Sequence, residues 1–373
     1  MRYNWQQKNW PNFTFDVSAF KEKLHRYAEE SAFLTGRITS LADGLRYDLI
    51  VDNLATEALY NSQIEGVRFS VEELKSSILN NLYPKIKKRH VSDYRAENLG
   101  RLMAENRSSY EQDLTEAMLF GWHELLLAHR SDVGDKGEWR TGEDPMQIVS
   151  GAYGRQKVHF EAPSSSMVPE EMENYLTWFN GRSREFYAQL YLSPVRAGIA
   201  HLWFESIHPF EDGNGRLGRI IAEKSLSQDL GYPLPFSLSY AVIQKQSAYY
   251  DALQSGSYRL DITKWSNYFV DTCLLGISLG RKSIELTLQK ARFYDRFEKA
   301  IDENELKAIE KMFAAGPKGF DGGMTTRKYV SINKVSSATA TRDLARLVEI
   351  GALERRGAGR STHYVLPGAE AVR

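Results

Sequence analysis

The chain has 373 residues, with 48 Lys and Arg against 48 Asp and Glu, so its formal net charge is zero. That length predicts two or three domains, and the zero balance excludes a protein that works by bulk positive charge as well as an acidic disordered tail. The single cysteine excludes an intramolecular disulfide framework. Since the sequence shows no export signal and no membrane-spanning apolar segment, a cytosolic protein is expected.

The dominant hydrophobic period is helical. Apolar residues recur at helical spacing from Gly44 to Glu65, and Gly66 supplies a C-terminal stop, so a helix is expected there. Ser70 and Glu73 have the spacing of a capping box, which predicts that another helix begins after Ser70. Further helical patterns cover residues 91–107, 111–129 and 170–290, separated by a Gly- and Asp-rich stretch at 131–154 and a strand-like run at 157–160.

The C-terminal part of the chain is expected to form a separate unit. Its predicted elements are a flexible break at residues 316–323, a short helix at 325–333, a longer helix at 336–350 and two strands at 352–356 and 361–366.

The most informative segment is Ile207–Arg219, which combines a histidine, an aspartate, two glycines and two arginines. Gly213 and Gly215 permit close backbone approach, and their amides at the start of a helix form a concave nest for an anion. Arg216 and Arg219 are three residues apart, so they share a helix face and can grip the oxygens of a polyphosphate.

Two side chains of the same run suit chemistry on a phosphate. Asp212 offers the hard oxygen that Mg²⁺ prefers when phosphates supply other ligands. His208 titrates near neutrality and can accept a proton from an attacking hydroxyl. A Gly/Asn turn between helices with surface arginines is the simpler interpretation; the full combination favours a phosphate-binding site.

The run matches all eight defining positions of the motif HxFx(D/E)GNGRxxR and therefore resembles the Fic-domain family of protein adenylyltransferases. The similarity extends to Gly137–Arg140 and to the expected helical surround from about residue 95 to 280. The N-terminal WxxxxWPxF pattern, with Trp5, Trp10, Pro11 and Phe13, looks like the leader of bacterial Fic proteins. The resemblance implies an all-α core with a small β-hairpin flap.

The resemblance also implies an activity, which is transfer of AMP from ATP to a Ser, Thr or Tyr hydroxyl of a target protein with release of pyrophosphate. His208 would deprotonate the hydroxyl, and Asp212 would hold the Mg²⁺ that bridges the α- and β-phosphates. Such chemistry depends mainly on positioning and charge neutralisation. The residues implied to contact the nucleotide in this run are Gly213, Asn214, Gly215, Arg216, Leu217, Gly218 and Arg219.

Two weaker resemblances concern the surroundings of this site. Lys157–Phe160, with Val158 and His159, resembles the family's flap, whose edge pairs with an extended segment of the target; a plain surface strand is the alternative. Tyr249 and Tyr250 resemble aromatic residues that flank the nucleoside, although core packing would also explain them. A further histidine, His201, is expected to be structural, because no second His or Cys lies at metal spacing from it.

The segment Tyr60–Gly66 resembles the inhibitory motif (S/T)xxxE(G/N) found before many Fic cores. There, the glutamate reaches the second motif arginine and occupies the place of the γ-phosphate, so Glu65 is expected to pair with Arg219. The first motif position is Asn61 instead of Ser or Thr, and Asn61 or Ser62 could supply an equivalent hydrogen bond. The alternative is an exposed glutamate at a helix C-terminus, where the helix dipole disfavours it.

The C-terminal unit resembles a winged helix-turn-helix (α+β), with residues 336–350 as the recognition helix and a Gly-tipped hairpin as the wing. Residues 301–373 hold twelve Lys and Arg against nine Asp and Glu, a net charge of +3. DNA binding and a dimerisation or target-docking role both stay open. The predicted DNA contacts are Arg342, Arg346, Arg355 and Arg356, and Arg360 lies in the same wing.

Together these predictions divide the chain into an N-terminal helical domain with the inhibitory helix at 1–94, a Fic core at 95–290 and a winged helix at 291–373. The expected function is an autoinhibited, Mg²⁺-dependent protein adenylyltransferase that also modifies itself, with no membrane partner. The alternative is a DNA-binding transcriptional regulator whose Fic core senses a nucleotide. The sequence leaves open a homodimer, removal of AMP with Glu65 aligning water, and another nucleotide or a phosphocholine-type donor.

Overall fold

The computed structural model describes residues 2–143, 145–150, 157–181, 190–316 and 319–368. These residues are mainly helical, with two small antiparallel sheets of two strands each. The chain groups into two compact units: Met1–Leu41 with Arg46–Gly280, and Ala42–Leu45 with Arg281–Arg373. The first unit contains most of the expected N-terminal domain and core, so a boundary between them at residue 94 stays a prediction.

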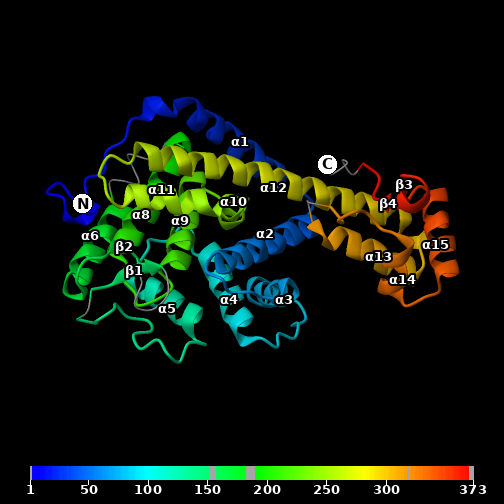
Figure 1. Cartoon of the computed structure of the whole chain (residues 1–373), viewed down its shortest axis with the longest axis horizontal. Helices are drawn as coiled ribbons and strands as arrows, with labels where there is room; N and C mark the ends of the chain where they lie inside the picture. Colours follow the sequence, from blue (N-terminus) through cyan, green and yellow to red (C-terminus); the bar gives the residue numbers. More distant parts are fainter. Residues whose placement is uncertain (1, 144, 151–156, 182–189, 317–318, 369–373) are drawn as a thin grey trace. The chain divides into compact units, whose positions relative to one another are not determined.

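The first part of the chain forms five helices, of which the first, at Lys21–Thr39, was not predicted from the sequence (Figure 1). They are α1 (Lys21–Thr39), α2 (Asp43–Ile64), α3 (Val71–Leu82), α4 (Tyr94–Ser108) and α5 (Glu116–Leu127). Short 3₁₀ turns at Asn4–Gln6 and Val17–Ala19 precede them. The predicted helices at 44–65, 91–107 and 111–129 are confirmed, with bounds that shift by one to five residues.

The predicted capping box of α3 is only half formed. The Ser70 hydroxyl accepts a hydrogen bond from the Glu73 amide at 3.4 Å, so the helix begins where expected. The Glu73 carboxylate instead accepts bonds from the amides of Ser92 (3.2 Å) and Asp93 (2.9 Å), which ties α3 to the start of α4. A tertiary contact has replaced the local one.

The middle of the chain contains a β-hairpin and the remaining helices of the first unit. The hairpin pairs β1 (Gln147–Ser150) with β2 (Lys157–Glu161), with an irregularity between Ile148 and Val149. The helices are α6 (Val168–Asn180), α8 (Ser193–Ile207), α9 (Asn214–Leu230), α10 (Leu238–Gln244), α11 (Gln246–Gly256) and α12 (Thr263–Phe297). Parts of the expected 131–154 loop and of the helical stretch from 170 to 290, namely 144, 151–154 and 182–189, lie outside the described residues.

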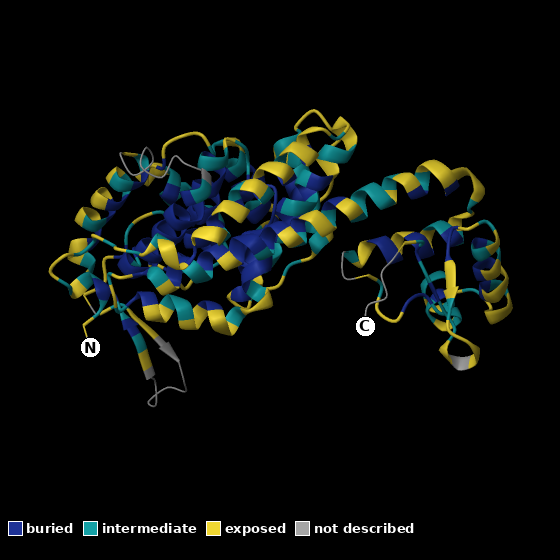
Figure 2. Ribbon diagram, turned by 90° about the horizontal axis from the view of Figure 1, so that it is seen from above, coloured by how far each residue is buried: buried dark blue, intermediate teal, exposed yellow. Residues whose placement is uncertain are grey.

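Helices α8 and α9 form the buried centre of this unit, and Figure 2 shows buried residues, in dark blue, gathered in its middle. Every residue of α8 is buried, and most of α9 is as well. A helix that is shielded on all sides must be covered by its neighbours, and α8 packs along α9 with α6 on another side. Gly218 permits this contact, because a Cβ there would lie 2.7 Å from His201 Nδ1 and 2.9 Å from Glu205 Oε1.

The second unit has its own hydrophobic core, which includes Phe293, Phe313, Tyr329, Leu344 and Leu347. Its elements are the C-terminal part of α12, α13 (Glu303–Ala314), α14 (Thr326–Asn333), α15 (Ser337–Glu349), β3 (Glu354–Arg356) and β4 (His363–Val365), with 3₁₀ turns at Glu298–Ala300 and Gly359–Ser361. The two strands pair as an antiparallel hairpin.

Both predicted strands of this unit are shorter than expected, and the second spans only His363–Val365. Ala352 and Leu353 both donate backbone hydrogen bonds to the Leu347 carbonyl, at 2.8 and 3.1 Å, and so belong to the turn that follows α15. The first strand therefore begins at Glu354. Residues 317 and 318 of the predicted flexible break lie outside the described residues.

Within the described ranges, none of the helices has the length and apolar character that crossing a bilayer requires.

Candidate active site

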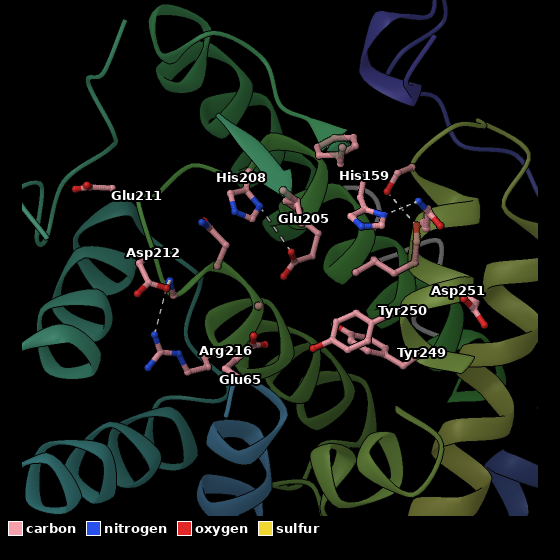
Figure 3. Close-up of a pocket in the computed structure, with 18 residues that line it drawn as sticks. Glu65, His159, Glu205, His208, Glu211, Asp212, Arg216, Tyr249, Tyr250 and Asp251 are labelled. Carbon is pink, nitrogen blue, oxygen red and sulfur yellow. Dashed lines mark hydrogen bonds and ion pairs between the residues drawn. The ribbon is translucent and has the colours of Figure 1, made fainter. Parts of the chain in front are cut away.

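A pocket with a volume of about 590 Å³ lies beside the turn that joins α8 to α9 (Figure 3). Its walls come from the end of α2, the β1–β2 hairpin, the turn itself, the start of α9 and α11. The lining residues are Glu65, Ile148, His159, Phe160, Glu205, His208, Glu211, Asp212, Gly213, Asn214, Gly215, Arg216, Tyr249, Tyr250, Asp251, Leu253, Gln254 and Ser257. Most of the residues predicted from the motif and from the weaker resemblances meet here.

The turn between α8 and α9 is fixed by its own side chains and by a stack of rings. Asn214 closes the turn, because its side chain accepts from the Phe210 amide at 3.0 Å and donates to the Phe210 carbonyl at 2.8 Å. The Phe210 ring is fully buried, stacked on His123 at 4.0 Å and tilted against Trp139 at 5.0 Å. Asn214 thus serves the shape of the loop, while its backbone amide belongs to the start of α9.

His208 ends α8 in a left-handed backbone conformation, with φ at 51°. This is uncommon for a residue with a side chain and marks a position that its surroundings must hold. The holding group is the buried Arg140, whose Nε donates to the His208 carbonyl at 2.7 Å and whose Nη2 donates to the Pro163 carbonyl at 2.6 Å. The segment Gly137–Arg140, noted above only as a resemblance, therefore positions the expected base.

The His208 ring is poised as a neutral imidazole. Burial and, to a smaller extent, the nearby charge of Arg140 lower its pKa to about 4. Glu205 lies one turn earlier on α8, with Oε2 3.8 Å from His208 Nδ1, and burial raises the pKa of its carboxyl to about 8 (Figure 3). At pH 7 both groups are therefore uncharged, so this close pair is not an ion pair, and His208 is free to accept a proton.

The start of α9 presents an anion-binding nest that a carboxylate already faces. Gly213 has φ at 85°, a left-handed conformation that favours glycine, and precedes the first turn of α9. A Cβ on Gly215 would lie 2.6 Å from Glu65 Oε1, so the Glu65 carboxylate sits directly on this turn. Negative charge is favoured at a helix N-terminus, where backbone amides have no intrahelical partner.

Glu65 and Asn61 together occupy the guanidinium of Arg219. Arg219 Nη2 donates to Glu65 Oε1 at 2.7 Å and to the Asn61 backbone carbonyl at 3.0 Å, while Nε donates to the Asn61 side chain at 2.6 Å. Asn61 also donates to the Arg216 carbonyl at 3.1 Å. The expected Glu65–Arg219 pair is confirmed. Asn61, at the position where the motif has Ser or Thr, accepts the other hydrogen bonds of the Arg219 guanidinium.

Arg216 is directed into the pocket and is nearly buried, at 5% exposure. Burial lowers its pKa, and its guanidinium makes a long polar contact of 3.4 Å from Nη2 to Asp212 Oδ1. A buried guanidinium favours an anionic partner, because desolvation of its charge is costly unless it is paired. Of the two motif arginines, Arg216 therefore faces the pocket, while α2 covers Arg219.

Asp212 fits the expected role of a cation ligand. It lines the pocket with a side chain that is 36% exposed, and its carboxylate accepts from Arg130 Nη1 at 2.8 Å and from the Gly213 amide at 2.6 Å. Mg²⁺ is commonly bound by one or two carboxylates together with substrate phosphates and water. A single half-exposed carboxylate beside an anion nest suits a Mg²⁺ ion that enters with a nucleotide.

Arg130 is a functional-site residue that the sequence did not indicate. It follows α5 outside any recognised pattern, and its guanidinium is shared between Asp212 and Asp132, with Nη2 2.7 Å from Asp132 Oδ2. A cation on Asp212 must therefore compete with this guanidinium. The only signal in the sequence is Asp132, two residues after Arg130. An arginine and an aspartate two residues apart are common on protein surfaces, so this spacing does not predict a functional site.

Tyr249 and Tyr250 of α11 both line the pocket but differ in how far they are buried. Tyr249 is buried, and its hydroxyl lies 2.8 Å from His201 Nε2 and 3.4 Å from Arg219 Nη1. Tyr250 is 43% exposed and donates to the Ile64 carbonyl at 3.3 Å. The position of His201, buried behind Tyr249, agrees with its expected structural role.

Four of the predicted contact residues do not line the pocket, and one of them is Arg219, which bonds to Asn61 of α2. Leu217 is fully buried in the core, and Gly218 is the contact point between α8 and α9. Val158 is 42% exposed on β2, whereas the alternation of a strand directs its neighbour His159 into the pocket. A seven-residue motif on a helix cannot turn all its residues to one side, so the contact set is narrower than expected.

The predicted DNA contacts of the second unit have different surroundings. The Arg342 side chain is 78% exposed, and Arg355 is exposed as well. Arg346 is bound to the fully buried Glu305, with Nε 2.9 Å from Oε1, and also donates to the Ala300 carbonyl at 3.0 Å. Arg356 pairs with Glu354 at 3.2 Å, and the Arg360 side chain lies outside the described residues.

Sequence comparisons match two segments of the chain. A family model described as "Fic/DOC family" matches residues 113–226, which include the motif at Ile207–Arg219, and one described as "Domain of unknown function (DUF4172)" matches residues 3–83. The second segment contains both the N-terminal leader and Glu65.

Among curated proteins, a Fido domain-containing protein of Dictyostelium discoideum is 36% identical over 94 residues, 25% of this chain and 64% of the relative. Protein adenylyltransferase fic-1 of Caenorhabditis elegans is 28% identical over 131 residues, 35% of this chain and 23% of the relative. The chain thus spans less than two thirds of the length of these relatives. A Fic family protein from Desulfovibrio desulfuricans G20 shares the fold over 96% of this chain and 99% of its own, with a TM-score of 0.52 and 21% identity.

Proposed function

The chain belongs to the Fic family, and from that premise we propose that it is a protein adenylyltransferase restrained by its own Glu65. It transfers AMP from ATP to a Ser, Thr or Tyr hydroxyl of a target protein, or of itself, and releases pyrophosphate. The observation that carries the proposal is one pocket in which a neutral His208, an anion nest and Arg216 converge, while Glu65 binds Arg219.

The reaction uses the chain's residues in distinct ways. His208 takes the proton from the acceptor hydroxyl, whose oxygen attacks the α-phosphorus as the bond to the β-phosphate oxygen breaks and pyrophosphate leaves. Amides at the start of α9 and the Arg216 guanidinium hold the phosphates. Mg²⁺, when bound with ATP at Asp212, neutralises phosphate charge, and the β2 strand holds the target's extended segment by strand addition.

Glu65 restrains the enzyme by occupying the phosphate end of the pocket. Its carboxylate lies on Gly215 and binds Arg219, so a γ-phosphate approaching that place meets like charge and finds the guanidinium already used. ATP bound in this state lacks the Arg219 clamp, and its α-phosphate is out of line with the acceptor hydroxyl. The restraint thus acts on alignment as well as on affinity.

The test is incorporation of label from α-³²P-ATP into the protein itself and into a total protein extract. Glu65→Gly frees Arg219 and removes the competing carboxylate, so labelling rises about tenfold or more, as expected for loss of a charge-assisted contact. His208→Ala in the Glu65→Gly background abolishes labelling and leaves ATP binding intact. Mass spectrometry identifies the adduct as AMP.

Glu72→Gly is the matched control, because Glu72 is an exposed glutamate in the first turn of α3. It removes the same charge and leaves labelling at the wild-type level. The restraint is wrong if Glu65→Gly, with ATP bound, labels no more than the wild type. The transferase proposal is wrong if ATP binds and no variant forms an AMP adduct.

A second candidate function is DNA-dependent regulation through the second unit, with the pocket as a nucleotide sensor. We propose that residues 291–373 form a winged helix-turn-helix, supported by three helices α13–α15 followed by the β3–β4 hairpin. The exposed Arg342 and Arg355 favour a role in contacting phosphates. His208 and Asp212 favour the transferase, because a sensor requires phosphate contacts but no base.

A further inference from the structure

The N-terminal leader, residues 3–13, contacts the strand that the proposed function assigns to target docking. It is the beginning of the segment matched only as a domain of unknown function. We propose that this leader is a positioning element that fixes β2 relative to His208 for the docking of the target polypeptide. The inference rests on the proposed function, because that function gives β2 its role.

The leader binds β2 directly at its C-terminal end. The indole Nε1 of Trp5 donates to the Glu161 carbonyl at 2.8 Å, and Glu161 is the last residue of β2. The Tyr3 ring meets the buried Phe160 ring edge-on, with 4.9 Å between centroids. Phe160 itself lines the pocket, so the leader forms a layer directly behind the pocket wall.

A second route joins the leader to β2 through Tyr258. The Tyr258 ring stacks on Tyr3 at 5.3 Å, and its hydroxyl donates to the His159 carbonyl at 2.9 Å. Gln7 donates to the Tyr258 carbonyl at 2.9 Å and holds that residue from the other side. Three consecutive residues of β2, from His159 to Glu161, therefore depend on the leader or on a residue that the leader holds.

The same leader is anchored to the helix that carries the base. Asn4 is fully buried, and its side chain donates to Ser206 Oγ at 2.7 Å, two residues before His208. Its backbone amide donates to the carbonyl of Ser257, a pocket-lining residue, at 2.7 Å. One short segment thus bonds to both the docking strand and the end of α8, which sets the distance between them.

A docking strand of this kind needs an external support. The hairpin has only two strands, and isolated two-stranded hairpins are marginally stable in water. Ile148 and Val158 expose apolar side chains on it, at 38% and 42%, which suits a strand that receives a partner. An acceptor hydroxyl must lie within hydrogen-bond reach of His208, so the strand that presents it must be held to within about 1 Å.

Two tryptophan substitutions separate positioning from general stabilisation. Trp5→Phe keeps an aromatic ring and removes the hydrogen bond to Glu161. Trp10→Phe is the matched control, because Trp10 Nε1 donates to Glu171 on α6, at 2.9 Å, and the Trp10 ring contacts Phe13 and Trp203. Both variants are made in the Glu65→Gly background and compared with the Glu65→Gly parent. The comparison is made under conditions in which the three proteins have equal thermal stability.

Three measurements are made on each variant: amide hydrogen exchange of residues 157–161, the dissociation constant of ATP, and the initial rate of α-³²P-ATP labelling at increasing concentrations of a total protein extract. Loss of one hydrogen bond predicts about fivefold faster exchange in β2 for Trp5→Phe, and a labelling rate at low extract concentration about fivefold lower. The ATP dissociation constant stays within twofold of the parent's. Trp10→Phe matches the parent in all three.

The proposal is overturned if Trp5→Phe and Trp10→Phe give the same β2 exchange and the same labelling. It is also overturned if Trp5→Phe weakens ATP binding as much as it slows labelling, because the leader would then shape the whole pocket. A Glu65→Gly parent that binds ATP without labelling anything contradicts the proposed function. Hydrogen exchange then still decides whether the leader holds β2.

Discussion

His208 is a residue whose chemistry is set by burial more than by its neighbours' charges. Burial lowers its pKa to about 4 and raises that of Glu205 to about 8, so the order of the two pKa values is the reverse of that in water. The imidazole is then neutral over the whole physiological range, as a general base requires. An exposed histidine at the same place would be partly protonated below pH 7.

The pH dependence of transfer follows from this shift. Above a pKa of about 4 the base is neutral, so the labelling rate of the Glu65→Gly variant is nearly flat from pH 7 to pH 5, where Glu205 stays protonated, and falls only as the pH approaches 4. The negative charge of Glu65 raises this pKa. Replacing Glu65 therefore moves the fall of the labelling rate to a still lower pH. The measurement is the labelling rate at saturating ATP in buffers of constant ionic strength.

An ordinary histidine, with a pKa of about 6.5, would be only about 3% neutral at pH 5. A rate that halves near pH 6.5 and continues to fall would therefore contradict the burial argument. Hydrogen exchange or circular dichroism at each pH shows whether the chain stays folded over the range.

At the scale of elements, the joint between α8 and α9 is held from outside by Arg140. Its guanidinium bonds simultaneously to the His208 carbonyl, the Pro163 carbonyl and Ser165 Oγ, the last at 2.9 Å. Lysine carries a single ammonium group and cannot span three acceptors in this fork. The base therefore owes its position to a loop that comes before β1 in the chain.

Arg140→Lys, in the Glu65→Gly background, is expected to lower the maximal labelling rate about tenfold, since small displacements of a catalytic group are costly. ATP affinity changes less than twofold, because the nest and Arg216 are untouched. The free energy of unfolding falls by about 2 kcal/mol, as expected when buried hydrogen bonds to a charged group are lost. Single-turnover labelling, ATP titration and urea unfolding measure the three quantities.

Arg95→Lys is the control, because Arg95 forms a similar fork with Asp93 at the start of α4, outside the pocket. Its labelling rate should equal the parent's. A variant of Arg140 that raised the ATP concentration needed for half-maximal rate, and left the maximal rate unchanged, would show that the arginine supports binding instead of positioning.

The sequence predicted elements and motifs well where the information is local. Helical periodicity located α2 and α15 to within a residue or two, and the resemblance at Tyr60–Gly66 predicted the Glu65–Arg219 pair across 154 positions. The contacts of Arg130 and Arg140 were not predictable, because both lie on irregular segments whose partners are set by tertiary packing. Glu73 shows the same limit, since a distant backbone replaced its expected capping bond.

At the scale of the whole molecule, a net charge of zero conceals local arrangements of opposite sign. In the first unit, Glu65 lies on a site built for anions. In the second, Arg346 binds the buried Glu305 and so contributes to the fold of that unit, while Arg342 stays exposed. The positive charge available on the surface of the C-terminal residues is therefore smaller than the count of basic and acidic residues suggests.

Because Arg342 is exposed and Arg346 is paired with Glu305, substitutions of the two arginines test DNA binding in different ways. If the second unit binds duplex DNA, Arg342→Ala weakens binding and reduces the slope of log affinity against log salt by about one. Arg346→Ala instead leaves Glu305 buried without its partner and destabilises the fold by about 3 kcal/mol or more. Electrophoretic mobility shift at several salt concentrations and urea unfolding separate the two effects.

Absence of a salt-dependent shift in the full chain, with or without ATP, would exclude the DNA-binding candidate and favour a protein-contact role for the hairpin. Equal loss of binding in both variants, with unchanged stability in Arg346→Ala, would show that the Arg346–Glu305 pair is not structural.

Arg219 is bonded to the backbone and side chain of Asn61 as well as to Glu65, so it fastens the last turn of α2 to α9. A nucleotide that draws this guanidinium towards its phosphates must loosen that turn. Thermodynamic reciprocity then requires that any ligand which tightens α2 weakens the nucleotide by the same factor, and that any ligand which pulls α2 away strengthens it. Control of this site can therefore be exercised from the outer surface of α2, by a regulator that never enters the pocket.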